Sequence, residues 1–128
     1  MACNAASSAL DLDIEEFGGD NFHSILPSGI RSVEASLASK IGLIGGERTI
    51  SSGFYRKRLS HLNREFCYFA AQPLSAFVER GELEGEAVET YLVDLLLKMG
   101  NVEGLLLTCT HHPALAKKWG KCQTSILF

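Results

Sequence analysis

One stretch near the C-terminus constrains the fold more than any other. Apolar residues run from Val102 to Leu107 and lead into the polar sequence Thr108-Cys-Thr-His-His112, after which Pro113 suits the first position of a helix. This order predicts a strand, a loop and a helix, with a thiol in the loop. In parallel α/β sheets such loops lie at the carboxyl ends of strands, where ligands bind. A thiol close to a helix N-terminus is also favoured as the thiolate.

Strand and helix patterns alternate along the rest of the chain, which predicts an α/β fold of a parallel sheet flanked by helices, in a single domain of residues 1–128. The clearest helix is Glu86–Met99, which has one apolar stripe and Gly100 as its expected end. Residues 27–29 are predicted to form a turn. The predicted strands are residues 22–26, 40–46, 65–71, 102–108 and 123–128, and the predicted helices are residues 4–17, 30–39, 47–59, 73–81, 86–99 and 114–119.

Composition argues against several classes of protein. The net charge of −3 and the lack of a basic block do not suggest a nucleic-acid-binding protein. No apolar run approaches the roughly 20 residues of a membrane-spanning helix, and the N-terminus lacks the basic region of a signal peptide. Four cysteines without a secretory signal are typical of reduced thiols, so we expect a cytoplasmic protein.

Two of the cysteines have sequence surroundings that suggest chemistry. Cys109 is followed by Thr110 and His111, polar residues that do not suit a core strand, although a lone buried cysteine is often only a small apolar residue. Cys3, at the start of a predicted helix, is a weak signal by itself. Two thiols at strand-to-helix turns can face one another across a cleft, where one removes a proton from a bound carbon and the other supplies a proton to its opposite face.

Other interpretations of the same residues remain open. Cys109, His111, His112 and Cys122 are ligand types that zinc accepts, but they lack a paired C-x₂₋₄-C spacing. A cysteine hydrolase or thiol-transfer enzyme needs one thiol and a histidine, and leaves Cys3 without a role. The glycines of residues 42–46 match neither G-x-G-x-x-G nor a P-loop, so no nucleotide cofactor is expected.

Two motifs and the segments between them resemble the glutamate racemases of the aspartate/glutamate racemase family. Ala2-Cys-Asn-Ala-Ala-Ser7 is similar to the family's first-cysteine motif Ala-Cys-Asn-Thr-Ala-Ser. Leu107-Thr-Cys-Thr-His-His-Pro113 is similar to the second, Leu-Gly-Cys-Thr-His-Tyr-Pro. Residues 40–45, 49–55 and 72–81 match further family segments in the same order. The histidine after Cys-Thr favours glutamate over aspartate racemases.

The resemblance implies interconversion of L- and D-glutamate without a cofactor or metal, supplying D-glutamate for bacterial peptidoglycan. Cys3 and Cys109 are the implied acid/base thiols, and His111 is expected to assist Cys109. Asn4 and Thr110 are expected to hold the amino and carboxylate groups of the substrate. The implied fold is one lobe of the two-lobed racemase.

The chain also departs from the family pattern. Ala5 occupies a substrate-binding position where the family has threonine, Thr108 replaces a glycine and adds bulk beside the thiol, and His112 replaces a tyrosine. The family's N-terminal Asp-Ser and Pro-Tyr-Gly segments and its closing helix have no counterpart, so the chain is expected to represent the second lobe with fragments of the first, with Cys3 at a poorly ordered end. We therefore expect weak racemisation or none. The alternative is a non-catalytic domain that forms a homodimer or binds a partner.

Overall fold

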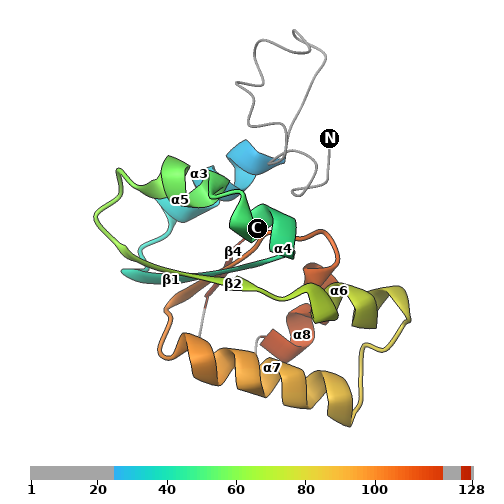
Figure 1. Ribbon diagram of the computed structural model, residues 1–128. Helices are drawn as coiled ribbons and strands as arrows, with labels where there is room; N and C mark the ends of the chain where they lie inside the picture. The colour runs from blue at the N-terminus through green and yellow to red at the C-terminus, as the bar shows by residue number, and fades with distance from the viewer. Residues whose placement is uncertain (1–24, 120–124, 128) are drawn as a thin grey trace, which may run out of the picture.

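The computed structural model describes residues 25–119 and 125–127, which form a parallel sheet between two layers of helices (Figure 1). The strands lie in the order β2-β1-β3-β4 and every neighbouring pair is parallel, which confirms the predicted α/β class. The strands are β1 (Lys40–Gly45), β2 (Glu65–Ala70), β3 (Gly104–Leu107) and β4 (Ser125–Leu127). The helices are α3 (Leu26–Ala35), α4 (Glu47–Ser51), α5 (Phe54–Leu59), α6 (Gln72–Glu79), α7 (Glu86–Met99), the 3₁₀-helix η2 (His112–Leu115) and α8 (Ala116–Trp119).

The order of the strands places a ligand-binding position between β1 and β3. From β1 the chain moves outward to β2, and then crosses back over β1 to reach β3 on its other side. Ile44 pairs with Phe69 on one side and with Leu107 on the other, so the three strands end at the same edge of the sheet. In open parallel sheets, the crevice at the carboxyl ends of strands whose connections diverge is where ligands bind.

Alternating side chains of the central strands support a separate core on each face of the sheet. Leu43 and Leu106 face the layer of α3 and α5, whereas Ile44 and Leu107 face the layer of α6 and α7. The first core contains Leu26, Val33, Ile41, Leu43, Phe54, Tyr55, Leu59 and Leu106. The second contains Ile44, Ala71, Leu74, Val88, Leu92, Leu95, Met99, Val102, Leu105, Leu107 and Leu115.

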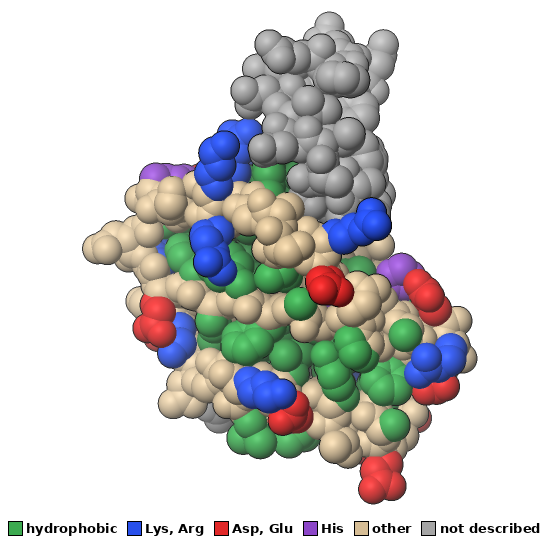
Figure 2. Space-filling model, in the orientation of Figure 1, with side chains coloured by type: hydrophobic (Ala, Val, Ile, Leu, Met, Phe, Trp, Pro, Cys, Tyr) green, Lys and Arg blue, Asp and Glu red, His purple; other side chains and the backbone are tan. Residues whose placement is uncertain are grey.

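β2 is an edge strand in the described part of the sheet, and its middle residues are only half-buried. Figure 2 shows hydrophobic side chains on both sides of this strand, toward α7 and toward the α4–α5 segment, with charged side chains spread around them. None of the described helices combines the length and the apolar character needed to cross a bilayer.

The predicted beginning of the described region is wrong. A strand was expected at 22–26 and a turn at 27–29, but Leu26 is the first residue of α3 and Pro27 lies in its first turn. Proline is tolerated there because the first helical N–H groups have no partner within the helix. The helix also ends earlier than expected, so that Leu37 is 99% exposed instead of lying on its apolar face.

The helix predicted at 47–59 is two short helices, because Gly53 interrupts it. Gly53 has φ +70°, a left-handed conformation that side chains other than glycine rarely adopt. The hydroxyl oxygen of Ser52 accepts a hydrogen bond from the N–H of Phe54 at 3.3 Å, a local contact that spans Gly53. The chain therefore changes direction between α4 and α5 while it stays on one face of the sheet (Figure 1).

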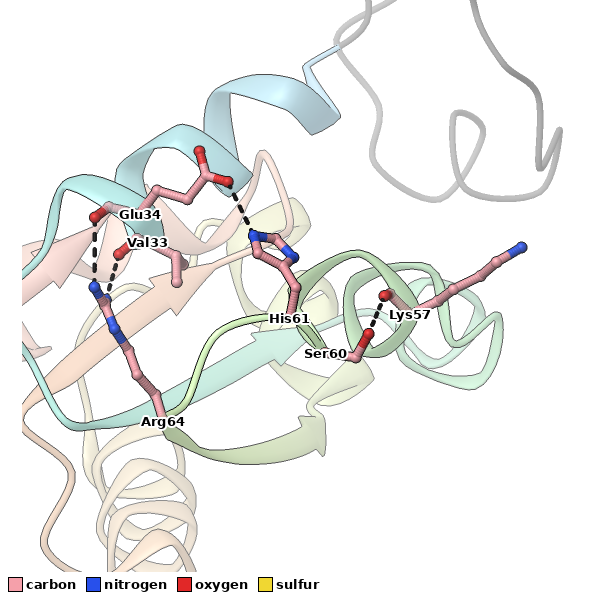
Figure 3. Close-up of polar contacts among 6 residues, drawn as sticks. All are labelled: Val33, Glu34, Lys57, Ser60, His61 and Arg64. Atoms are coloured by element: carbon pink, nitrogen blue, oxygen red, sulfur yellow. Dashed lines mark hydrogen bonds and ion pairs between the residues drawn. The ribbon is translucent and has the colours of Figure 1, made fainter.

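Arg64 fixes the end of α3 against the segment that leads into β2 (Figure 3). Its guanidinium donates to the carbonyl of Val33 at 2.6 Å and to that of Glu34 at 3.4 Å. These carbonyls belong to the last turn of the helix, where a cation is favoured by the helix dipole. His61 lies nearby with its Nε2 3.5 Å from the Glu34 carboxylate.

The prediction for Glu86–Met99 is confirmed at both ends. Val88, Leu92, Leu95 and Met99 are buried against the sheet, as the apolar stripe predicted. Gly100 follows with φ +66°, a backbone angle that favours glycine, at the position where the sequence placed the end of the helix. The strands predicted at 40–46, 65–71 and 102–108 are present with slightly shorter bounds, and β4 lies within the strand predicted at 123–128. The helix predicted at 4–17 lies outside the described residues.

Candidate active site

Thr108 anchors the turn that carries the candidate thiol. Its N–H and its hydroxyl both donate to the carbonyl of Ile44, at 2.8 and 3.0 Å, so the end of β3 stays tied to β1. The buried Thr108 side chain lies over Gly45, where an added Cβ would overlap its hydroxyl oxygen. The bulk that we expected beside the thiol is therefore accommodated above β1.

The Cys109 thiol is half-buried between two polar side chains. Its Sγ lies 3.4 Å from the hydroxyl oxygen of Ser75 in α6 and 3.6 Å from Nδ1 of His111. Burial works to raise the pKa of the Cys109 thiol, but the hydrogen bonds from the Ser75 hydroxyl and from the backbone and ring of His111 outweigh it. The net pKa is below the ordinary value, which favours the thiolate, the form that acts as a base.

Glu79 extends this arrangement from the far side of the imidazole. His111 Nε2 lies 3.6 Å from the Glu79 carboxylate, an ion pair when the ring is protonated. Glu79 follows Ser75 by four residues in α6, so both side chains lie on the same face of that helix. Carboxylate, imidazole and thiol thus stand in sequence, the order in which a carboxylate orients a histidine that exchanges protons with a thiol.

The sequence predicted Cys109, Thr110 and His111 as site residues, and the structure places all three in the turn that follows β3. Ser75 and Glu79 were not predicted as site residues, although 72–81 was noted as a matching segment. The available signal was two polar positions four residues apart on a helix that begins at the carboxyl end of a strand.

The expected helix N-terminus beside the thiol is not an α-helix. The residues after the turn form the 3₁₀-helix η2, which begins at His112 with Pro113 as its second residue, and α8 starts only at Ala116. So short a 3₁₀ segment supplies little dipole. The lowered pKa of the Cys109 thiol therefore comes from its hydrogen-bond partners, Ser75 and His111.

A cavity of about 200 Å³ lies next to Cys109. Its walls include Cys109 and Thr110 from the turn, Pro113 from η2, and Ile25, Gly29 and Tyr55 from the α3–α5 side. Leu106 and Leu107 also line it, so it lies at the carboxyl end of β3, the side of a parallel sheet where ligands bind. Thr110, expected to contact substrate, borders this cavity.

The His112 side chain points into the protein interior and belongs to no cluster of possible zinc ligands among the described residues. The side chain is fully buried, and neither ring nitrogen has a hydrogen-bond partner among the described residues. Burial lowers the pKa of His112 to about 4, and the nearby Ile44 carbonyl counteracts this only in part. Residues 25–119 and 125–127 contain no group of three His, Cys, Asp or Glu side chains that could hold a metal, and Cys122 lies outside them.

Cys3, Asn4 and Ala5 also lie outside the described residues. Their predicted meeting with Cys109 therefore stays a prediction. The same holds for the assignment of residues 1–128 to a single domain.

Comparison with known proteins identifies relatives for this chain, although no family model matches it. A glutamate racemase from Aquifex aeolicus is 39% identical over 124 residues, covering 92% of this chain and 47% of the relative. One from Streptococcus gordonii is 32% identical and covers 90% and 45%. The crystal structure of a glutamate racemase isoform from Bacillus anthracis superposes with a TM-score of 0.83 at 26% identity, covering 97% of this chain and 50% of the other. The chain is similar to the glutamate racemases.

The chain spans about half the length of the curated glutamate racemases that it matches. The structural superposition covers half of the racemase chain as well, which confirms the expected racemase-type lobe.

Proposed function

We propose that this chain carries the two acid/base thiols of a glutamate racemase site, Cys109 and Cys3. The observation that carries the proposal is the Cys109 sulfur, held between Ser75 and His111, in a residue that lines a cavity at the carboxyl end of β3. Its lowered pKa suits a group that must take up and return a proton near neutral pH. The kinship with glutamate racemases names the substrate class.

The reaction is a proton transfer on each face of one carbon. The Cys109 thiolate removes the α-proton of glutamate, and the electron pair of the broken C–H bond remains on the α-carbon and its carboxylate. The Cys3 thiol then delivers its proton to the opposite face. The reverse direction starts with Cys3 as thiolate and Cys109 as thiol, so both thiols must work in both protonation states.

Polar groups around the substrate supply the remaining stabilisation. An α-proton is weakly acidic, so hydrogen bonds to the carboxylate must lower the energy of the developing negative charge. Thr110 at the cavity wall and Asn4 are the proposed ligands for the carboxylate and amino groups. His111, oriented by Glu79, assists proton exchange at Cys109.

We further propose that the biological role is the supply of D-glutamate for peptidoglycan in the cytoplasm, without a cofactor. Because the chain spans about half of its racemase relatives, we expect net racemisation by the 128-residue chain to be weak.

Exchange of the α-proton with solvent is the sharpest test, because it requires only one working thiol. Purified chain is incubated with L-glutamate or with D-glutamate in D₂O, and α-deuterium is measured by mass spectrometry. Circular dichroism of the same samples reports net racemisation. We expect deuterium to enter one enantiomer faster than the other, since Cys109 faces one side of the carbon.

Two alanine variants make the test specific. Cys109→Ala is expected to abolish exchange in the enantiomer whose α-proton faces Cys109, whereas Cys67→Ala, which removes a half-buried thiol from β2, is expected to retain it. Exchange no faster than in buffer, or equally fast in the Cys109→Ala variant, would contradict the proposal. Rapid net racemisation that depends on Cys109 would overturn only the expected weakness.

A second candidate, a cysteine hydrolase, is favoured only by the spatial arrangement in which the Glu79 carboxylate, the His111 imidazole and the Cys109 thiol follow one another. Such an enzyme would release many equivalents of p-nitrophenol per chain from p-nitrophenyl acetate. A single equivalent that labels Cys109 and then stops would indicate a reactive thiol without hydrolase activity.

Homodimerisation stays a prediction, which light scattering of the pure chain tests.

A further inference from the structure

Ser75 stands out among the partners of Cys109 because it is the most shielded from water. Its side chain lies in α6 and the residue is 5% exposed, while the His111 side chain is 40% exposed. The hydroxyl oxygen is 3.4 Å from the sulfur, and either atom can be the donor. Thirty-four residues separate the two in sequence, so tertiary packing alone brings them together.

We propose that Ser75 is a positioning residue that holds the Cys109 sulfur in both of its protonation states. This inference rests on the proposed racemase function, in which the same thiol is base in one direction and acid in the other. It adds a residue to the site that the two cysteine motifs do not contain.

A hydroxyl suits this role because it is both donor and acceptor on a freely rotating bond. Toward a thiolate it donates its proton, and toward a thiol it accepts the S–H. Neither state leaves a buried polar group without a partner, which would be costly. The hydrogen bond that the hydroxyl donates to the charged thiolate is the stronger of the two, so loss of the hydroxyl raises the pKa of the Cys109 thiol.

Packing alone is the competing explanation for a serine at this position, and side chains of equal shape separate the two. Ser75→Thr keeps the hydroxyl, and Ser75→Val has nearly the same shape without it. Ser75→Ala removes one atom and adds none, so it covers the case in which the larger side chains disturb α6. Ser60→Ala is the matched control, because the Ser60 hydroxyl donates to the Lys57 carbonyl on the exposed surface of α5 (Figure 3).

The measurement is the rate at which iodoacetamide alkylates Cys109 between pH 5 and 10, followed by peptide mass spectrometry. Cys67 in the same sample is an internal reference, since burial raises its pKa and it has no contact with Ser75 among the described interactions. Melting temperature is recorded for every variant.

We expect Ser75→Val and Ser75→Ala to alkylate Cys109 about three- to tenfold more slowly than the unchanged chain at neutral pH. The midpoint of the pH profile should move upward, while the rate at high pH stays equal or rises slightly, since a thiolate of higher pKa is more nucleophilic. Ser75→Thr and Ser60→Ala should stay within about twofold of the unchanged chain.

The midpoint is the deciding readout, because a purely structural role would change the melting temperature without moving it. Equal midpoints in the Thr and Val variants, with Ala equal to the unchanged chain, would overturn the inference. The outcome is separable from the proposed function, since alkylation needs no substrate. A shifted midpoint with no α-proton exchange in the unchanged chain would retain Ser75 as the partner of the thiol and reject racemisation.

Discussion

At Gly45 the backbone of β1 lies so close to the Thr108 hydroxyl that the two positions depend on each other. We expect Gly45→Ala to destabilise the chain by about 1–3 kcal/mol, the usual cost of forcing an extra carbon into a packed core. In a chain that already carries Thr108→Ala, the obstructing oxygen is gone, so the same substitution should cost less. Urea unfolding of the two single variants and the double variant measures the coupling. Strictly additive effects would show that the contact does not limit the fold.

His112 makes stability depend on pH in the acidic range. Its pKa is about 4 in the folded chain, against about 6.5 in an unfolded one. Below pH 6.5 the unfolded chain binds a proton that the folded chain cannot yet accept, so the unfolding free energy falls as the pH is lowered from about 6.5 to 4. The total loss should approach about 3 kcal/mol, and it should level off below pH 4.

Urea titrations at several pH values test this dependence. His112→Phe should flatten the part of the profile between pH 6.5 and 4, because the ring then has no proton to bind. His61→Gln, a change at an exposed histidine, should leave that part in place. A His112→Phe profile as steep as that of the unchanged chain would assign the acid sensitivity to other groups.

The residues of the site differ in how far sequence could predict them. Cys109, Thr110 and His111 are adjacent, so a local motif identifies them together. Ser75 reaches the thiol, and Glu79 reaches the imidazole of His111, only because α6 packs beside η2. A serine or glutamate on a helix has no distinguishing pattern. The sequence indicates that Thr108 adds bulk beside the thiol, but Gly45, the glycine that makes room for it, lies on another strand.

Among the elements, α7 shows most clearly how burial converts a sequence pattern into stability. Leu92 is 5% exposed against the sheet, whereas Leu97, one and a half turns further along, is 76% exposed. Leu92→Ala should therefore cost about 2–5 kcal/mol, and Leu97→Ala should stay within about 0.5 kcal/mol. Chemical unfolding of both variants gives the comparison directly. A similar loss at both positions would mean that the outer face of α7 is also buried by a contact.

The elements that were predicted correctly have patterns that burial imposes. The 86–99 helix has an apolar stripe that packs against the sheet, and the strand at 40–46 is a short apolar run that is buried on both faces of the sheet. The helix at 47–59 was wrongly joined, since Gly53 acts through a backbone angle that apolar spacing does not reveal. The start of α3 was missed because Pro27 suits both a turn and a first helical turn.

Taken as a whole molecule, the two cores share one sheet and should unfold together. β3 contributes Leu106 to one core and Leu105 to the other, so neither layer can open while the strand stays fully paired on both faces. We expect Leu59→Ala, in the α5 layer, to speed hydrogen exchange in α7 as much as in α5. Mass spectrometry of exchanged peptides measures both helices at once. Faster exchange confined to α3 and α5 would divide the fold into two independent units.

Ser75 and Glu79 project from the same short helix toward the same thiol and imidazole. A small tilt of α6 away from η2 would therefore lengthen both contacts at once. Cys109 would then lose the hydrogen bond from Ser75, and its thiol would react more slowly. The rate at which a thiol-reactive dye labels Cys109 would consequently indicate whether α6 is packed against η2, and this measurement does not require a bound substrate.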